Sequence, residues 1–388
     1  MLTGRERVVR ALCHEEPDRV PYGGEGIAQP TADVILGRPC VLEMAGELRR
    51  MELWSKGRNE ELRRRIFDDA HGIAKKIGLD FYRLPGLGPA DKSPGPKMLG
   101  PNSWTFNNKM IYEYMLESAE IRGSSFGKYS NKTTEDLEGY VKRLEEHTDD
   151  EIDASLERIQ EYRGLMKQFT EELKIAVYGH GAACFMFDNE WLPTLIRCCY
   201  ARPDLIRRYE AQEVRRGMKQ GAIEVELGCD VIYIGTDIAY NHGPIVSPKY
   251  YHDLIMPYMR MQTDYFHKLG AFVMISSDGN LWPIIDDYLI GTDVDAQREI
   301  QTSVMDRCKL KERFGDRICF VGNVDTQWIL PFGSTEDVVK ETKDCIRVLS
   351  PGGGHILMSS NSINQAVKPE NFFTMLKTKD RYGIYNRY

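Results

Sequence analysis

Short apolar runs alternate with longer helical patterns through the C-terminal half of the chain. Five runs are clear, at 175–179, 231–235, 271–276, 317–321 and 355–358, and each leads through a polar turn into a helical pattern. Continuous apolar runs of this length are typical of strands buried on both faces, and intervening helices suit right-handed parallel βαβ units. The sequence therefore predicts an α/β protein built on a parallel sheet.

The number of strands distinguishes a closed barrel from an open sheet. A strand near 77–82, and one or two more before residue 175, bring the total near eight. That total favours a (β/α)8 TIM barrel over an open doubly wound sheet. A short strand is also expected at 293–296, and helices are expected at 151–172 and from about 281 to 290. We expect one domain over residues 1–388, with a helical N-terminal extension over about 1–70, the barrel over about 71–388, and inserted loops and hairpins at 86–130.

Composition argues against several classes of protein. The net charge is −7, and binding to nucleic acid or an anionic membrane needs clustered cations, so neither partner is expected. The first residues do not include the apolar segment of a secretory signal. The chain has nine cysteines, and no two of them have CxxC spacing. Free thiols are typical of a reducing compartment, and we expect a cytoplasmic protein without a membrane span.

The glycine motifs that hold nucleotide phosphates are absent. No GxGxxG follows a first strand, and no GxxxxGK[ST] occurs anywhere. No nucleotide cofactor is therefore expected.

Polar residues follow the predicted strands, and in a barrel they meet at one mouth because the carboxyl ends of all strands face the same way. Asp237 and Asp278 are the leading catalytic candidates, since two carboxylates in one cavity can act as acid and base, and His180 is a candidate base. Each Asp can instead cap the helix that follows it. Six residues are expected to contact substrate, namely Asn323, Asn361, Ser276, His242, Tyr82 and Gln297, and Asp80 and Asp325 are also placed at strand ends.

A metal site is the alternative to plain acid catalysis, and the sequence leaves it open. Its ligands would come from Asp237, Asp278, His180, His242 and Glu25. No cysteine lies at a predicted strand end, so a thiolate-rich zinc site is not expected.

Several short motifs occur in an order that resembles the uroporphyrinogen decarboxylase superfamily. They are Thr3–Val8 with Pro17–Pro21, Ser247-Pro248, Met256–Tyr258, Ser277–Asn280, Gly322–Asp325 and Lys368–Asn371. The resemblance runs across nearly the whole chain and implies a distorted (β/α)8 barrel.

Departures from the superfamily pattern indicate which branch of the superfamily this chain resembles most. The decarboxylases have an arginine-rich segment where this chain has Tyr22–Gly26, and a His-Gly where it has Ser360-Asn361. The zinc-dependent methyltransferases have His-x-Cys where this chain has Ser276–Asp278, and a further Cys where Asn361 stands. By elimination the chain is most similar to the methyltransferase component of O-demethylase systems.

That resemblance implies a methyltransferase of one-carbon metabolism. It would move a methyl group from a small methylated donor, a methyl ether or methylamine, to the corrinoid (cobalamin) of a partner protein. The alternatives are a decarboxylase of the uroporphyrinogen type and a non-catalytic barrel that binds a partner. Whether the chain forms a homodimer stays open.

Overall fold

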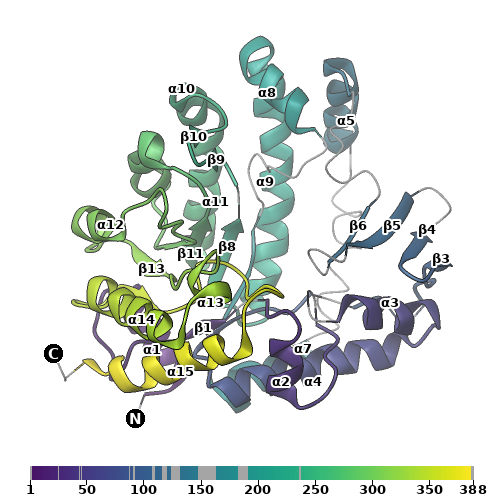
Figure 1. Ribbon diagram of the computed structural model, residues 1–388. Helices are drawn as coiled ribbons and strands as arrows, with labels where there is room; N and C mark the ends of the chain where they lie inside the picture. Colours follow the sequence, from purple (N-terminus) through teal and green to yellow (C-terminus); the bar gives the residue numbers. More distant parts are fainter. Residues whose placement is uncertain are drawn as a thin grey trace.

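In the computed structural model, eight parallel strands form a barrel surrounded by helices (Figure 1). The structure describes residues 2–24, 26–42, 44, 46–86, 88–90, 92–106, 110–115, 120–123, 132–146, 163–181, 191–235 and 237–385. The eight parallel strands and the surrounding helices confirm the predicted (β/α)8 TIM barrel.

The barrel strands follow one another in space in the order in which they occur along the chain. They are β1 (Gly23–Gly24), β2 (Phe81–Arg83), β7 (Ala176–His180), β8 (Val231–Gly235), β11 (Phe272–Ser276), β12 (Ala296–Arg298), β13 (Cys319–Val321) and β14 (His355–Ile356). The barrel closes between its last and first strands, where the Gly23 N–H donates to the Leu357 carbonyl at 2.9 Å and the Leu357 N–H donates to the Pro21 carbonyl at 2.9 Å.

Helices cover the outside of the barrel. The α-helices of the described chain are α1 (Gly4–Leu12), α2 (Thr31–Leu36), α3 (Glu47–Ser55), α4 (Asn59–Ile77), α5 (Thr134–Glu146), α7 (Arg163–Lys167), α8 (Leu192–Ala201), α9 (Pro203–Glu226), α10 (Pro248–Tyr250), α11 (Met256–Lys268), α12 (Arg307–Phe314), α13 (Ile329–Phe332), α14 (Thr335–Leu349) and α15 (Pro369–Tyr382). Thr3 and Ser334 begin α1 and α14 with reciprocal capping boxes, which satisfy backbone N–H groups that a helix leaves without partners. None of the described helices is long and apolar enough to cross a membrane.

Alternate strand residues fill the barrel interior with an apolar layer. Phe81, Tyr178, Val231, Met274 and Ala296 belong to one buried cluster, which also includes three apolar residues of α1. The N–H of Arg5, in α1, donates to the carbonyl of Lys174, which lies just before β7, at 2.9 Å. The first helix therefore closes the N-terminal end of the barrel.

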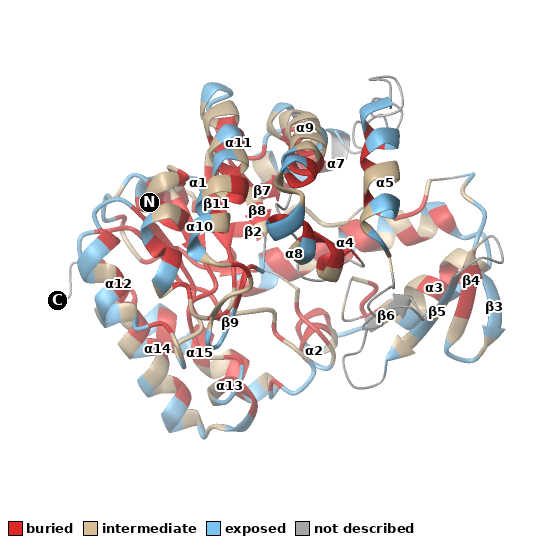
Figure 2. Cartoon of the chain, turned by 90° about the horizontal axis from the view of Figure 1, so that it is seen from above, coloured by how far each residue is buried: buried red, intermediate tan, exposed pale blue. Residues whose placement is uncertain are grey.

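The outward strand residues form the larger core between the sheet and the helices. Ile232, Ile234, Val273, Ile275 and Phe320 belong to that cluster and are almost fully buried. Figure 2 shows buried residues concentrated in the strands and on the helix faces turned toward them. Because both faces of each strand are buried, the strands appear in the sequence as continuous apolar runs.

A second sheet lies beside the barrel (Figure 1). Its antiparallel strands are β3 (Lys97–Gly100), β4 (Ser103–Phe106), β5 (Met110–Met115) and β6 (Glu120–Gly123). Phe106 packs on Trp54 of α3 with ring centroids 4.8 Å apart. The hairpins expected at 86–130 are present in the part of that segment that the structure describes.

Several boundaries differ from the sequence-based expectation. The barrel takes β1 from within residues 1–70, where the sequence analysis places an extension, because two glycines carry no apolar pattern. The strand expected at 293–296 lies at Ala296–Arg298. The helix expected from about 281 is divided into a 3-10 turn (Trp282–Ile284) and a π-helical turn (Asp287–Gly291). Most of the helix expected at 151–172 falls outside the described residues.

Asp80 lies at the opposite end of the barrel from the predicted mouth. The helix before it runs to Ile77 and the strand starts at Phe81, so Asp80 precedes its strand instead of following it. It accepts hydrogen bonds from Arg19 at 2.6 Å and 2.9 Å, from Arg7 at 3.3 Å, and from the Tyr22 N–H at 2.9 Å. Asp80 therefore joins the N-terminal segment to the barrel and takes no part in the mouth.

We expect Asp80→Ala to lower the free energy of unfolding by about 3 to 5 kcal/mol, because it removes a buried carboxylate that pairs with Arg19 and accepts the buried Tyr22 N–H. Urea unfolding followed by circular dichroism measures the loss. The control is Asp286→Ala, whose carboxylate is 72% exposed and pairs with Arg313 on the surface. Removing that surface pair should cost less than about 1 kcal/mol. Equal losses in the two variants would contradict a structural role for Asp80.

Candidate active site

A layer of polar side chains lies next to the apolar interior, on the side of the carboxyl ends of the strands. Arg83, His180, Tyr233, Ser276 and Arg298 each stand two residues after an inward member of the apolar cluster. Side chains two apart on a strand point to the same face, so all five side chains point into the barrel, at the carboxyl ends of β2, β7, β8, β11 and β12.

Contacts connect this layer from one strand to the next. The Arg83 Nε–H donates to His180 Nε2 at 2.8 Å, and the rings of His180 and Tyr233 form a T-shaped contact with centroids 5.6 Å apart. The Tyr233 hydroxyl hydrogen-bonds the Ser276 hydroxyl. The Arg298 guanidinium lies 5.5 Å from the Tyr233 ring centroid. The layer is thus a connected set of polar groups.

His180, predicted to be a base, is a neutral acceptor in this layer. Burial, followed by the positive charge of Arg83, lowers the pKa of His180 to about 3. The Glu224 carboxylate, on α9, accepts the His180 backbone N–H, and burial raises the pKa of Glu224 to about 7. His180 is therefore unsuited to take up a proton at neutral pH, and positions Arg83 instead.

Three carboxylates converge at the mouth. Asp237 follows β8, Asp278 follows β11 and Glu299 follows β12, and their carboxylate oxygens lie within 4.8 Å of one another. The Asp278 N–H donates to Asp237 Oδ1 at 3.3 Å, and Arg298 Nη2 donates to Glu299 Oε1 at 2.6 Å. The structure thus brings together the predicted pair Asp237 and Asp278, and adds Glu299. We call these three residues the carboxylate trio.

Asp278 is the member of the trio best suited to carry a proton. Burial, followed by the negative charges of Glu299 and Asp237, raises the pKa of Asp278 to about 7. Asn361 Nδ2 donates to Asp278 Oδ2 at 3.1 Å and opposes that shift. Near neutral pH this carboxyl group is therefore about half protonated.

The turn that carries Asp278 is held by its backbone. Gly279 has φ +90°, and a Cβ there would lie 2.5 Å from the Ala239 carbonyl oxygen, so this position requires glycine. The Ser277 hydroxyl accepts the Ile238 N–H at 3.1 Å, which ties the turn to the loop after β8.

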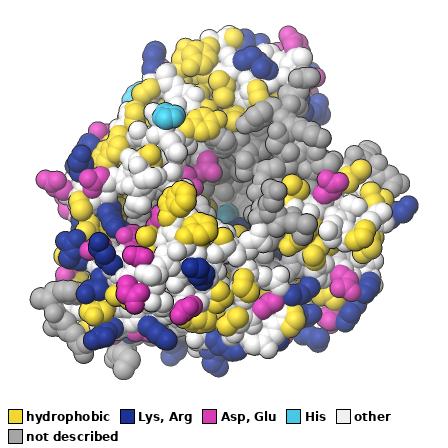
Figure 3. Space-filling model, in the orientation of Figure 1, with side chains coloured by type: hydrophobic (Ala, Val, Ile, Leu, Met, Phe, Trp, Pro, Cys, Tyr) yellow, Lys and Arg dark blue, Asp and Glu magenta, His cyan; other side chains and the backbone are white. Residues whose placement is uncertain are grey.

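Asp278 and Asn361 line an open cavity of about 790 Å³ at the mouth. Trp328 and Phe332, which are 67% and 65% exposed, lie on its rim. Asp278 also borders an adjoining pocket of about 630 Å³ that is lined by His242. Figure 3 shows the molecule hollowed near the middle of this face, with acidic side chains in the wall. Bound molecules can therefore reach Asp278 from outside.

The trio supplies only carboxylate oxygens as metal ligands. Oxygen ligands suit hard cations such as Mg²⁺, Ca²⁺ or Mn²⁺, whereas zinc sites usually include histidine or cysteine. Neither His180 nor His242 is a member of the trio. Glu25 lies outside the described residues. A zinc site does not fit these ligands, and the adjacent Arg298 already supplies a positive charge to Glu299.

Two expected substrate contacts point away from the mouth. Gln297 pairs in register with Ile275 and Phe320, whose side chains belong to the outer core, so Gln297 faces the helices. Tyr82 belongs to the same outer core and contacts Phe169 with ring centroids 6.0 Å apart. Ser276 and Asn361, in contrast, lie with the polar layer and the trio.

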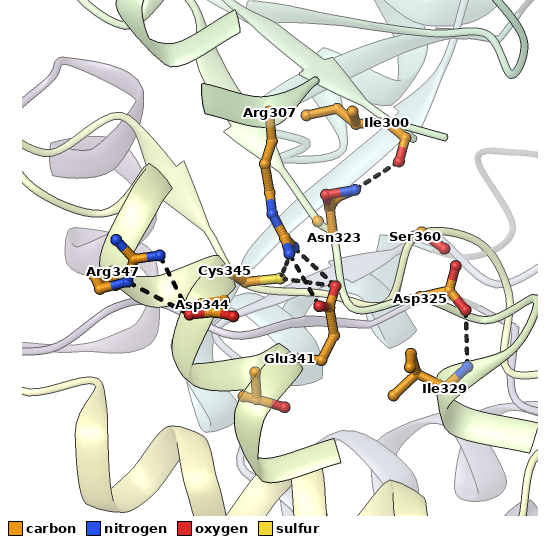
Figure 4. A network of polar contacts seen from close by, with 12 residues as sticks. Ile300, Arg307, Asn323, Asp325, Ile329, Glu341, Asp344, Cys345, Arg347 and Ser360 are labelled. Carbon is orange, nitrogen blue, oxygen red and sulfur yellow. Dashed lines mark hydrogen bonds and ion pairs between the residues drawn. The ribbon is translucent and has the colours of Figure 1, made fainter. Parts of the chain in front are cut away.

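Two further strand-end residues act on the backbone (Figure 4). Asn323 is fully buried and its Nδ2 donates to the Ile300 carbonyl at 2.6 Å. Asp325 accepts the N–H groups of Trp328 and Ile329 at 2.6 Å and 2.9 Å, so it holds the turn that leads into α13. Both residues support the loops around the mouth.

A partly buried ion pair lies behind these loops (Figure 4). Arg307 binds both carboxylate oxygens of Glu341, at 2.8 Å and 2.9 Å, and donates to Cys345 Sγ at 2.8 Å. Burial, followed by the Glu341 charge, raises the pKa of the Cys345 thiol. This thiol stays protonated, so the network joins α12 to α14 and provides no nucleophile.

Sequence reasoning missed Arg83, Arg298 and Glu299. Arg83 follows a strand of only three residues, and the predicted end of the strand at 293–296 came two residues too early. The available signal was weak, because the charged pair Arg298-Glu299 follows Asp293-Val294-Asp295-Ala296-Gln297, which contains no continuous apolar run.

One solved structure shares this fold over nearly the whole chain. A methyltransferase from Methanosarcina mazei is similar over 98% of this chain and 99% of its own, with 18% identity and a TM-score of 0.68. A sugar phosphate isomerase/epimerase from Parabacteroides distasonis matches over 94% of this chain and 96% of its own, with 9% identity and a TM-score of 0.37. No curated protein matches the chain. The model of the uroporphyrinogen decarboxylase (URO-D) family matches residues 166–382, more than half of the sequence, and the chain belongs to that family.

Proposed function

We propose that the chain is a methyltransferase that moves a methyl group from a small methylated donor, a methyl ether or a methylamine, to the cob(I)alamin of a partner corrinoid protein. The observation that supports this proposal most directly is Asp278, a carboxyl group with a pKa of about 7 in an open mouth. The similarity of the fold to a methyltransferase is consistent with it. With a methyl ether as donor, the reaction is an O-demethylation.

Removing a methyl group from an ether requires a proton on the oxygen that leaves. The protonated Asp278 carboxyl supplies it, so the donor leaves as an alcohol and Asp278 becomes a carboxylate. The mouth is open, and solvent returns the proton. Asp237 and Glu299 hold the proton on Asp278 until the ether oxygen takes it, because two nearby negative charges disfavour a third.

Asn361 orients the acid. Its Nδ2 donates to Asp278 Oδ2, which leaves the other oxygen as the site of the proton. Its Oδ1 accepts the Ser362 N–H at 2.7 Å, so the amide is fixed in that orientation. Asn361 therefore presents the acidic proton in one direction.

The mouth fits an acceptor carried by a second protein. Cob(I)alamin supplies a strong nucleophile for the methyl carbon, and the chain itself must leave access to the donor. The cavity opens outward beside exposed Trp328 and Phe332, aromatic groups of the kind enriched where proteins associate. This arrangement agrees with an acceptor that arrives from outside.

Decarboxylation of a porphyrinogen with eight carboxylates suits this site less well. A polyanionic substrate needs cations around it, whereas the mouth presents the carboxylate trio. Release of CO2 from uroporphyrinogen by the purified chain would reverse this ranking. A barrel that only binds a partner would instead keep that binding and show no turnover with any donor.

Asp278→Asn should lower the rate of methyl transfer by about 10²- to 10⁴-fold, because the acid is lost while the shape of the side chain is kept. The rate is measured from the absorbance change when a reduced corrinoid protein is methylated by a panel of methoxy compounds and methylamines. The matched control is Asp286→Asn, an exposed aspartate on the surface, which should leave the rate unchanged.

Two outcomes would contradict acid catalysis by Asp278. One is an unchanged rate in the folded Asp278→Asn variant. The other is a stoichiometric divalent cation, found by elemental analysis of the wild type and absent from the variant, which would assign the trio to a metal site.

The rate with an ether donor should fall as pH rises through about 7, because the proton on Asp278 is lost there. Asp237→Asn removes a negative charge that raises the pKa of Asp278, so the fall should move to lower pH. Initial rates from pH 5 to 9 measure both midpoints. A fall that stays at the same pH in Asp237→Asn would contradict the coupling.

A further inference from the structure

The carboxylate trio lies on one side of the polar layer, away from β2 and β7 in the order of the strands. β2 and β7, which are neighbours in the barrel, carry Arg83, His180 and Tyr178. The trio follows β8, β11 and β12, farther along the same sheet order. A molecule that bridges the two sides therefore meets hydrogen-bond donors at β2 and β7, and at β8, β11 and β12 it meets the trio together with Arg298, which is already paired with Glu299.

The chemistry of the Arg83 side is that of a donor set. His180 accepts from Arg83 at Nε2, so its imidazole, which is neutral, carries its proton on Nδ1 and offers an N–H there. Among the described residues, the hydrogen bonds of His180 are made by Nε2 and by the backbone N–H. Arg83 adds a permanent positive charge.

Tyr178 completes the donor set. It lies in register with Arg83 on the neighbouring strand, and its ring meets that of Tyr233 with centroids 6.0 Å apart. Its side chain is fully buried and points into the barrel, and its hydroxyl has no hydrogen-bond partner among the described residues. A buried hydroxyl without a partner costs free energy, and a bound acceptor removes that cost.

From these observations we infer a carboxylate subsite formed by Arg83, His180 and Tyr178, which binds an anionic group at the far end of the methyl donor. Guanidinium, imidazole N–H and phenol O–H all donate, and a carboxylate accepts from several donors at once. The trio repels the same group, so the donor binds with its carboxylate toward Arg83 and its methylated atom toward Asp278. This inference rests on the proposed function and specifies its substrate class.

Direct binding to the purified chain tests the subsite without any corrinoid protein. The probes are 4-methoxybenzoate and methoxyacetate, each compared by calorimetry with its amide, which has the same shape and no charge. At least one carboxylate should bind the wild type 10-fold or more tightly than its amide. Arg83→Gln should abolish the preference, Arg83→Lys should restore part of it, and Tyr178→Phe should weaken it several-fold.

Arg347→Gln is the matched control, because that arginine lies on the surface of α14 with its side chain 69% exposed. It should keep the full preference. Tyr178→Phe tests the subsite independently if Arg83→Gln does not fold. Equal binding of acid and amide by the wild type, or a preference that survives in both Arg83→Gln and Tyr178→Phe, would overturn the inference.

The methyl-transfer assay separates this inference from the proposed function. Carboxylate preference without methyl transfer from any donor would reject the function and keep the subsite. Methyl transfer from neutral ethers, with no carboxylate preference in binding, would reject the subsite and keep the function.

Discussion

The architecture of the site depends on the two-residue alternation of strands in a closed barrel. Each inward side chain has its successor two residues later, one level nearer the carboxyl end. In five strands the inward residue nearer the amino end is apolar, or in one case tyrosine, and the inward residue two positions later is polar. The lower level seals the interior together with α1. The upper level can then be polar because it opens toward the mouth.

Polar groups in a barrel interior are stable only when they bind one another. The cost of taking a charge or a hydroxyl out of water is severalfold larger than the net gain from one hydrogen bond, so partners are required. Arg83 with His180, Tyr233 with Ser276, and Arg298 with Glu299 meet that requirement pairwise. Asp278 is different, because its closest charged neighbours are also acidic. Burial and these negative charges raise the pKa of Asp278 to about 7, so the mouth contains a carboxylic acid that can donate a proton near neutral pH.

Some elements were predictable and others were not, for identifiable reasons. Val231–Gly235 is found where it was expected, because burial on both faces leaves a continuous apolar run. β1 was missed, since two glycines carry no pattern. Asp80 was placed at the wrong end of its strand, because the apolar residues at the end of α4 merge with those of β2. Among site residues, Asp237 and Asp278 were found because each follows a clear run, whereas Glu299 follows a strand whose end was placed too early.

The sequence by itself determined the class of fold, the face on which chemistry occurs, and a pair of aspartates at that face. Periodicity and order along the chain carry this information, because they are local properties. Only the tertiary structure decided that Gln297 and Tyr82 face the helices, that His180 is held neutral by Arg83, and that Glu299 joins the two aspartates. Those properties depend on distances between residues far apart in sequence and on burial, which shift the protonation of a group without changing its identity.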